Sequence, residues 1–98
     1  MTYELRLRPE AEWDIEEAAH WYEAQREGLG HDFVNAVEDI LDKVRAKPLA
    51  YPVVYRGSRR ALIQKFPFGI HFIVVGSIIS VLAVIHGSRH PRHWQSRT

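Results

Sequence analysis

The stretch GIHFIVVGSIISVLAVIH, residues 69 to 86, decides the fold of this 98-residue chain. Two runs rich in Val, Ile and aromatic residues, 69–75 and 78–86, are separated by Gly76-Ser77. β-branched and aromatic residues favour strands, and a two-residue linker that begins with glycine is typical of a tight turn between strands. The stretch therefore predicts an antiparallel β-hairpin.

Two further runs before this hairpin also show the two-residue period of strands, namely VVY at 53–55 and RRALIQKF at 59–66. The sequence Pro67-Phe68-Gly69 indicates a tight turn that leads into the hairpin. Near the start of the chain, TYELRLR at 2–8 alternates apolar with charged residues, which predicts a half-buried strand.

Between these strands the apolar residues recur at helical spacing instead. Pro9 suits the first turn of a helix, and Gly28-Leu29-Gly30 predicts its end. A second helix is expected from about Asp32 to Ala46, with Pro48 ending it. Because the linker is short, the two helices should form an antiparallel hairpin. The residues expected to face the core are Ala11, Ile15, Ala18, Tyr22, Phe33, Val34, Val37, Ile40, Leu41 and Val44.

The predicted order is a strand, two helices and then three or four antiparallel strands. This order indicates an α+β fold with the helices on one face of the sheet. A chain of this length is expected to form one domain, residues 1–98. It has no cysteine, no apolar segment typical of a signal peptide and no apolar run long enough for a bilayer. We therefore expect a soluble cytoplasmic protein without a membrane partner.

The net charge of +1 conceals a separation of charge along the chain. Residues 1–47 contain all 12 carboxylates but only 6 Lys and Arg, so their net charge is −6. Residues 48–98 contain the other 7 Lys and Arg and no carboxylate, so their net charge is +7. The preference of helices for Glu explains part of this polarity. The remainder predicts a potential that steers an anionic partner.

The most cationic segment follows the hairpin directly and has the sequence HGSRHPRHW, residues 86–94. The spacing of its three histidines is compatible with a zinc site. Zinc-bound histidines are commonly held by carboxylates, however, and residues 48–98 contain none, while two intervening arginines would repel a dication. We therefore expect no metal and no cofactor, and we interpret the segment as a surface that binds a partner.

This target-binding surface combines cations with an aromatic ring, as surfaces that bind nucleic acids do. Its expected members are Arg60, His86, Arg89, His90, Arg92, His93 and Trp94. Arg97 is expected to add a further cation, and Trp94 could alternatively cap the core of the sheet. Arg59 and Arg60 are successive strand residues and must face opposite ways, so only one of them can join the surface.

Several motifs occur in a fixed order along the chain. They are Gly28-Leu29-Gly30, Tyr51-Pro52, Phe66-Pro67-Phe68, Val81-Leu82-Ala83-Val84 and His86-x-x-Arg89-x-Pro91. Together they resemble toxins of the RelE/ParE superfamily from bacterial type II toxin–antitoxin modules, and the ParE-like branch most closely. The resemblance implies a toxin that poisons DNA gyrase without an identified chemical step. It also implies a cognate antitoxin of the ribbon-helix-helix type, through which alone the toxin would contact operator DNA.

RelE-like members of the superfamily instead cleave mRNA on the ribosome, which requires a base, an acid and cations around the phosphate. In such nucleases an arginine follows the FPF-like turn and a tyrosine ends the last strand. This chain has Gly69-Ile70-His71-Phe72 and Gly87 at those places, and no carboxylate is expected in the sheet. His86 is the one candidate acid or base. The nuclease set therefore looks incomplete, and a ribonuclease or a degenerate toxin that only binds remain the alternatives.

Trp13 and Trp21 project from the outer side of the first predicted helix. An exposed pair of tryptophans is costly unless a partner or a neighbouring loop covers it. The resemblance implies that the antitoxin covers them by packing its tail against the helical hairpin. Substitutions at His86 or Arg89 are then expected to leave antitoxin binding intact.

Overall fold

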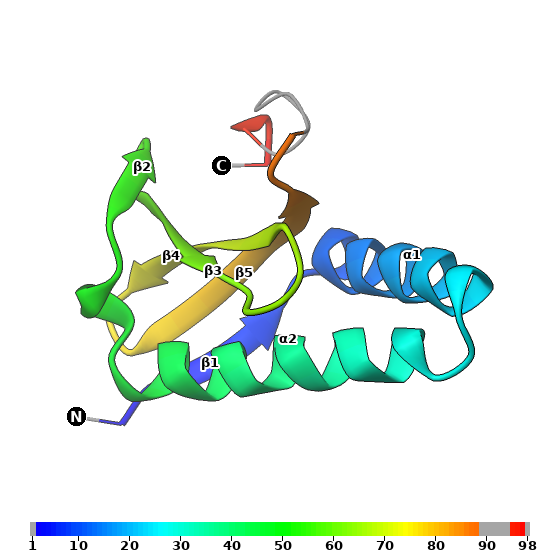
Figure 1. The fold of residues 1–98 in the computed structure, drawn as a ribbon. Helices are drawn as coiled ribbons and strands as arrows, with labels where there is room; N and C mark the ends of the chain where they lie inside the picture. The colour runs from blue at the N-terminus through cyan, green and yellow to red at the C-terminus, as the bar shows by residue number, and fades with distance from the viewer. Residues whose placement is uncertain (1, 89–94, 98) are drawn as a thin grey trace.

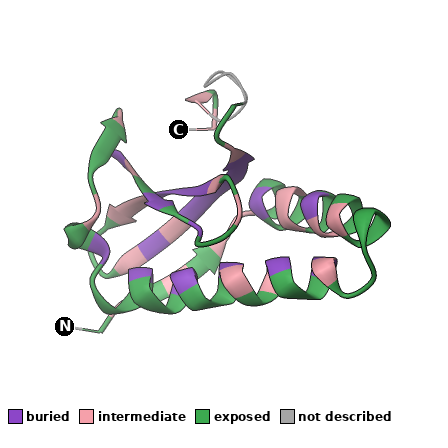
Figure 2. Ribbon diagram, in the orientation of Figure 1, coloured by how far each residue is buried: buried purple, intermediate pink, exposed green. Residues whose placement is uncertain are grey.

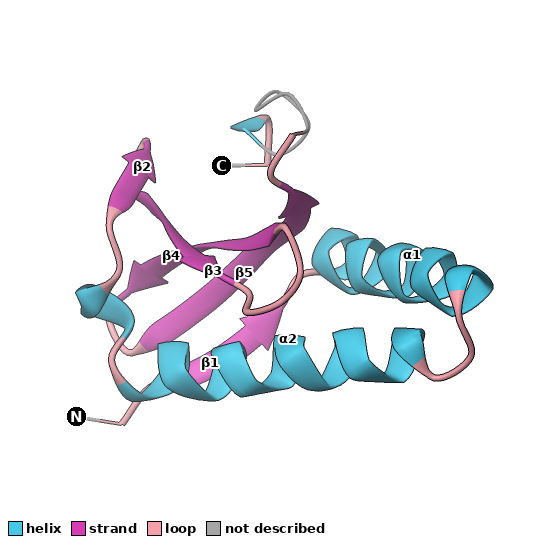
Figure 3. Ribbon diagram, viewed as in Figure 1, coloured by secondary structure: helices cyan, strands magenta, loops and turns pink. Residues whose placement is uncertain are grey.

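The computed structural model describes residues 2–88 and 95–97 of the chain. In order, its elements are β1 (Glu4–Leu7), α1 (Pro9–Gln25), α2 (Leu29–Ala46), the 3-10 turn η1 (Pro48–Ala50), β2 (Val53–Tyr55), β3 (Ser58–Leu62), β4 (Phe68–Val75) and β5 (Ile78–His86). The two helices run antiparallel on one face of the sheet (Figure 1; Figure 3). The predicted α+β class and order of elements are therefore confirmed. Neither helix in the described part of the chain is long and apolar enough to cross a bilayer.

The sheet is five-stranded and mixed, with the order β1-β5-β4-β3-β2. Strands β2 to β5 pair antiparallel, whereas β1 pairs parallel to β5, from Glu4 opposite Ile78 to Leu7 opposite Val81. The helical hairpin and strands β2 to β4 together connect these two parallel strands, which need a long crossover. The expectation of a sheet without carboxylates is wrong, because Glu4 belongs to β1. Its side chain is exposed, bonds to Arg6 and lies at the far end of β5 from His86.

The main core lies between the helices and the sheet (Figure 2). One stripe of α2 is buried along its whole length, and it packs with buried residues of β3, β4 and β5. These buried residues are Phe33, Val37, Ile40, Leu41, Val44, Ala61, Ile70, Phe72, Ile79, Val81 and Val84. The helical period thus places the apolar residues of α2 on the face that meets the strands.

Aromatic contacts fix the turn between β3 and β4 against the helices. The ring centroid of Phe33 lies 5.2 Å from that of Phe66 and 5.0 Å from that of Phe68. Tyr22 adds a third edge contact, 4.9 Å from Phe66. Because Phe66 turns inward to reach these rings, β3 ends at Leu62 and not at residue 66 as predicted. The turn therefore holds a fixed position beside the end of β5.

The helical junction departs from the predicted glycine stop, since α2 begins at Leu29 and not near Asp32. The carboxylate of Glu23 accepts backbone N–H groups of Gly28, at 3.0 Å, and Gly30, at 3.0 Å. These hydrogen bonds lower the pKa of Glu23 and satisfy donors at the start of α2. Gly30 is required for a second reason, because a Cβ there would lie 2.5 Å from the Ala19 carbonyl oxygen.

Candidate functional site

His86 is the last residue of β5 and stacks edge-on against Phe68 of β4, with ring centroids 5.3 Å apart. The backbone N–H of Ser88 donates to His86 Nδ1 at 3.0 Å, and the Ser88 hydroxyl lies 2.8 Å from the same atom. Because Nδ1 accepts an N–H, the neutral ring carries its proton on Nε2. His86 therefore presents a hydrogen-bond donor to its surroundings, which suits binding better than general-base catalysis.

Two cavities flank His86. The first, called here the apolar pocket, has a volume of about 500 Å³ and is lined by Asp14, Glu17, Ala18, Trp21, Tyr22, Pro67, Phe68, Val84, Ile85, His86 and Ser88. The second, called the basic pocket, has a volume of about 330 Å³ and is lined by Arg60, Leu62, Ile63, Phe66, Pro67, Phe68, Gly69, His71, Ile85, His86 and Gly87. The two pockets share four residues, so they adjoin at the end of the hairpin that decides the fold.

The structure brings Arg60 and His86 together, since both line the basic pocket. Arg59 turns the other way, and its guanidinium donates to the Tyr51 carbonyl oxygen at 2.6 Å. The side chains of Arg59 and Arg60 therefore lie on opposite sides of β3, as the strand period predicts. Arg60 is exposed in β3, with its side chain available to a partner.

Trp13 and Trp21 are exposed on α1, with relative accessibilities of 65% and 60%. Only Trp21 lines the apolar pocket, where His86 forms part of the same wall. The residue predicted to bind the antitoxin thus lies beside a residue predicted to bind the target. Sequence periodicity gave no indication of this, because it does not report how α1 packs against the end of β5.

His71 is a residue of the site that the sequence analysis missed. It is opposite Arg60 in the β3–β4 register and is only 5% accessible. Burial, and to a smaller extent the neighbouring guanidinium, lowers the pKa of His71 to about 4, so the ring is neutral at neutral pH. Gly69 leaves space for both groups, because a Cβ there would lie 3.2 Å from the Arg60 stem and 3.8 Å from His71 Nε2.

Asp14 forms the most buried ion pair among residues 2–88 and 95–97, and it joins three parts of the chain. Its Oδ2 accepts the Val84 N–H at 3.0 Å and the Arg97 guanidinium at 2.7 Å. Arg97 also donates to the Leu82 carbonyl oxygen at 3.2 Å, and Arg8 donates to the Arg97 carbonyl oxygen at 2.8 Å. The expectation that Arg97 adds to the free cations of the surface is therefore wrong. Arg97 instead bonds to Asp14 of α1 and to Leu82 of β5.

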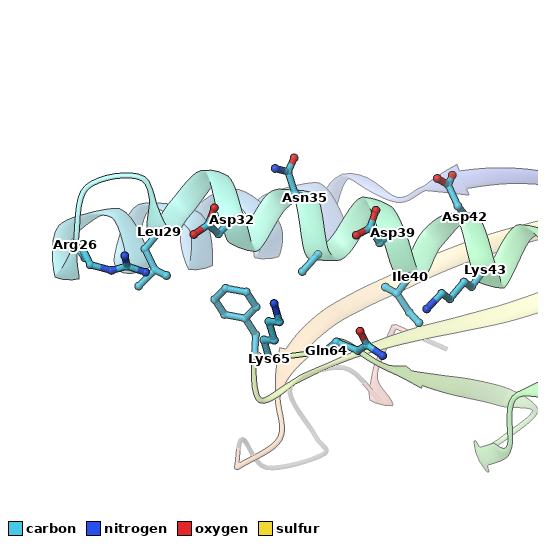
Figure 4. A pocket seen from close by; sticks show the side chains of 12 residues that line it. Arg26, Leu29, Asp32, Asn35, Asp39, Ile40, Asp42, Lys43, Gln64 and Lys65 are labelled. Carbon is cyan, nitrogen blue, oxygen red and sulfur yellow. The ribbon is translucent and has the colours of Figure 1, made fainter.

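A third cavity, of about 840 Å³, lies elsewhere, between α2 and the segment that precedes β4. Ile40 points toward Gln64 and Lys65, whereas Asn35 and Asp42 point away from them (Figure 4). Of the predicted binding residues that the structure describes, Trp13, Trp21, Arg60 and His86, none lines this cavity.

Five of the predicted site residues, Arg89, His90, Arg92, His93 and Trp94, lie outside the described residues. Their role in target binding stays a prediction. Within the part of the chain that the structure describes, no three His, Asp or Glu residues are grouped so that they could hold a metal ion.

Comparisons with known proteins place this geometry in a family. Residues 5–91 match the family described as the ParE toxin of the type II toxin–antitoxin system parDE. A solved chain from the "Chromosomal ParDE TA system from P. aeruginosa" has the same fold, with a TM-score of 0.67 and 22% sequence identity. The similarity covers 87% of this chain and 96% of that one. None of the curated proteins compared with the sequence matches it. The chain therefore belongs to the ParE family of toxins from type II toxin–antitoxin systems.

Proposed function

We propose that this toxin acts in the cytoplasm, arrests growth by poisoning DNA gyrase, and is neutralised by a cognate antitoxin of the ribbon-helix-helix type. Membership of the ParE family over residues 5–91 is the observation that carries the proposal. The surface at the end of the β4–β5 hairpin is the proposed point of contact with the target. Arg60 and His86 contribute a cation and an N–H donor there. From the sequence, we propose that Arg89, His90, Arg92, His93 and Trp94 also take part in target binding.

The groups around His86 favour binding over RNA cleavage. Cleavage needs a base that takes the proton of a 2′-hydroxyl group. The Nδ1 atom of His86 already accepts the Ser88 N–H, and His71 is neutral but almost fully buried. Asp14 is engaged by Arg97 and Val84. These side chains are therefore better placed to position a target than to move protons.

One observation keeps a ribosome-dependent mRNA endonuclease as the second candidate. Glu17 and His86 line the same pocket, so a carboxylate and an imidazole N–H donor face one cavity. Such a pair could supply a base and an acid on either side of a phosphate. This carboxylate belongs to α1, which packs beside β5 of the sheet.

For the antitoxin, we propose a segment that lies across α1 and covers Trp13 and Trp21. Both rings are exposed, and covering them would remove apolar area from water. Because Trp21 and His86 share the apolar pocket, a segment seated on Trp21 would also obstruct His86. Neutralisation would then act directly on the target-binding surface, and operator DNA would be contacted only through the antitoxin.

Expression of the chain alone from a tightly controlled promoter tests the proposal. A gyrase poison should arrest growth and induce the DNA-damage response before protein synthesis stops. A ribonuclease should stop translation first and leave cleaved mRNA. A degenerate toxin would produce neither effect, and either of the last two results would contradict the proposal.

A further inference from the structure

The apolar pocket and the basic pocket differ in chemistry although they adjoin. Both contain Pro67, Phe68, Ile85 and His86 in their walls, so one ligand that passes His86 can contact both. Both pockets lie at the end of the β4–β5 hairpin opposite its turn.

The basic pocket has the composition of an anion site. Its lining within residues 2–88 and 95–97 includes one arginine and two histidines and no carboxylate. The guanidinium of Arg60 supplies the charge, and the neutral ring of His71 on the neighbouring strand lines the pocket without adding charge. Gly69 has no side chain to occupy the space beside Arg60 and His71. A phosphate group fits both the charge and the available volume.

The apolar pocket has the composition of a site for a flat ring. Trp21 is 60% exposed, and Tyr22, Phe68 and His86 also line the pocket. Aromatic side chains of this kind stack on nucleic acid bases. Glu17 adds a carboxylate, which accepts hydrogen bonds from the amino groups of bases and repels phosphate. The carboxylate therefore fixes the direction in which a nucleotide can lie.

We propose that the two pockets together hold one unpaired nucleotide of a nucleic acid strand, with its phosphate at Arg60 and its base against Trp21. This inference rests on the proposed function and deepens it, because gyrase handles DNA and a toxin that contacts an unpaired nucleotide would engage the substrate of its target. A base that is paired and stacked in a duplex could not enter the apolar pocket, so the site selects single strands.

Fluorescence anisotropy with a labelled ten-nucleotide oligo-dC tests the proposal directly on the full chain. Cytosine is chosen because its amino group can donate to Glu17. The variant Arg60→Gln should weaken binding roughly tenfold and reduce the salt dependence by about 0.7 in the log–log slope, as expected for one lost phosphate contact to a single strand. The variant Trp21→Leu should also weaken binding roughly tenfold, by loss of base stacking.

Two matched control variants distinguish oligonucleotide binding at the two pockets from non-specific binding elsewhere on the protein. Arg45→Gln removes the same charge from α2, and Trp13→Leu removes an equally exposed indole from α1. Both should bind within about twofold of the wild type, since each lies outside the two pockets. Circular dichroism melts of all four variants establish that they are folded.

The possible outcomes are distinct. The inference would be overturned if the oligonucleotide did not bind, or if the control variants weakened its binding as much as the pocket variants do. It would also be overturned if Arg60→Gln weakened binding and Trp21→Leu did not. Tighter binding of an acidic peptide than of the oligonucleotide would overturn it as well. Tighter binding of oligo-rC than of oligo-dC would support the nucleotide site but contradict gyrase as the target. A toxin that damages DNA through gyrase without binding the oligonucleotide would refute this inference and leave the proposed function standing.

Discussion

Replacement of Asp14 by alanine should destabilise the fold far more than replacement of an exposed acid. The carboxylate of Asp14 accepts two hydrogen bonds, from the Val84 N–H and from the Arg97 guanidinium. Its side chain is 11% accessible and that of Arg97 is 20% accessible, so water can compensate only partly for the loss. The substitution therefore leaves a buried backbone donor and a largely buried cation without their acceptor.

The size of the effect follows from these two losses. An unsatisfied buried donor costs about 1–3 kcal/mol, and breaking a buried ion pair from one side costs about 3–5 kcal/mol. The two costs overlap, because Arg97 retains the Leu82 carbonyl oxygen and lies near solvent. We expect a loss of roughly 3 kcal/mol in the free energy of unfolding, which lowers Tm by about 12–24 °C for a domain of this size.

Urea unfolding followed by far-ultraviolet circular dichroism measures this loss. Asp42→Ala provides a matched control, because Asp42 pairs with Arg45 on the surface, with side-chain accessibilities of 74% and 49%. That control should cost at most about 0.5 kcal/mol. A double-mutant cycle of Asp14→Ala with Arg97→Gln should give a coupling of about 1–3 kcal/mol. Equal stability of the two aspartate variants, or a coupling near zero, would refute the reasoning.

Three further predictions follow from other parts of the molecule. The pKa of His71 falls from 6.5 to about 4 on folding. Between pH 4 and pH 6.5 the unfolded chain therefore binds a proton at His71 that the folded chain does not bind. Stability should therefore decrease by up to about 3 kcal/mol as the pH falls from 6.5 to 4, and His71→Leu should remove that component of the slope in urea unfolding. Gly30→Ala should lower the free energy of unfolding by about 2–3 kcal/mol in the same assay, because its Cβ would lie 2.5 Å from an α1 carbonyl oxygen. Gly57→Ala is the control, since a Cβ there meets no atom within 4 Å. It should lower the free energy of unfolding by only about 1–2 kcal/mol, because the φ of Gly57 is +79°. In growth-arrest assays His86→Gln should keep most of the toxicity and Arg89→Ala should lose most of it; the reverse pattern would favour acid–base chemistry at His86.

Much of the fold could be predicted because the deciding signals are local. The run 69–86 specifies its own hairpin, and the apolar period of α2 specifies which face is buried. The parallel pairing of β1 with β5 could not be predicted, since a strand's alternation identifies its buried face but not its neighbour. The start of α2, predicted near Asp32 but found at Leu29, also depends on a contact that the local sequence does not show. Its N-terminal donors are satisfied by Glu23, a residue of the preceding helix that the usual capping patterns do not include.

The site could be predicted only in part. Arg60 and His86 are recognisable in the sequence as polar residues of predicted strands. The strand period shows that Arg59 and Arg60 face opposite ways but not which of them faces the pocket. His71 was missed because its role depends on the β3–β4 register, which places it opposite Arg60. The proximity of Trp21 to His86 likewise depends on the packing of α1 against β5. Composition and spacing report residue types, whereas these relations are properties of the tertiary structure.

The most direct test of the central claim is a plasmid-cleavage assay with purified gyrase, ATP and the purified toxin. Detergent and protease added at the end of the reaction convert trapped cleavage complexes into linear DNA. If the toxin poisons gyrase, linear plasmid should appear only when gyrase and the toxin are both present, together with a loss of supercoiling. Unchanged supercoiling and no linear DNA, from a preparation that cleaves mRNA in a translation extract, would contradict it.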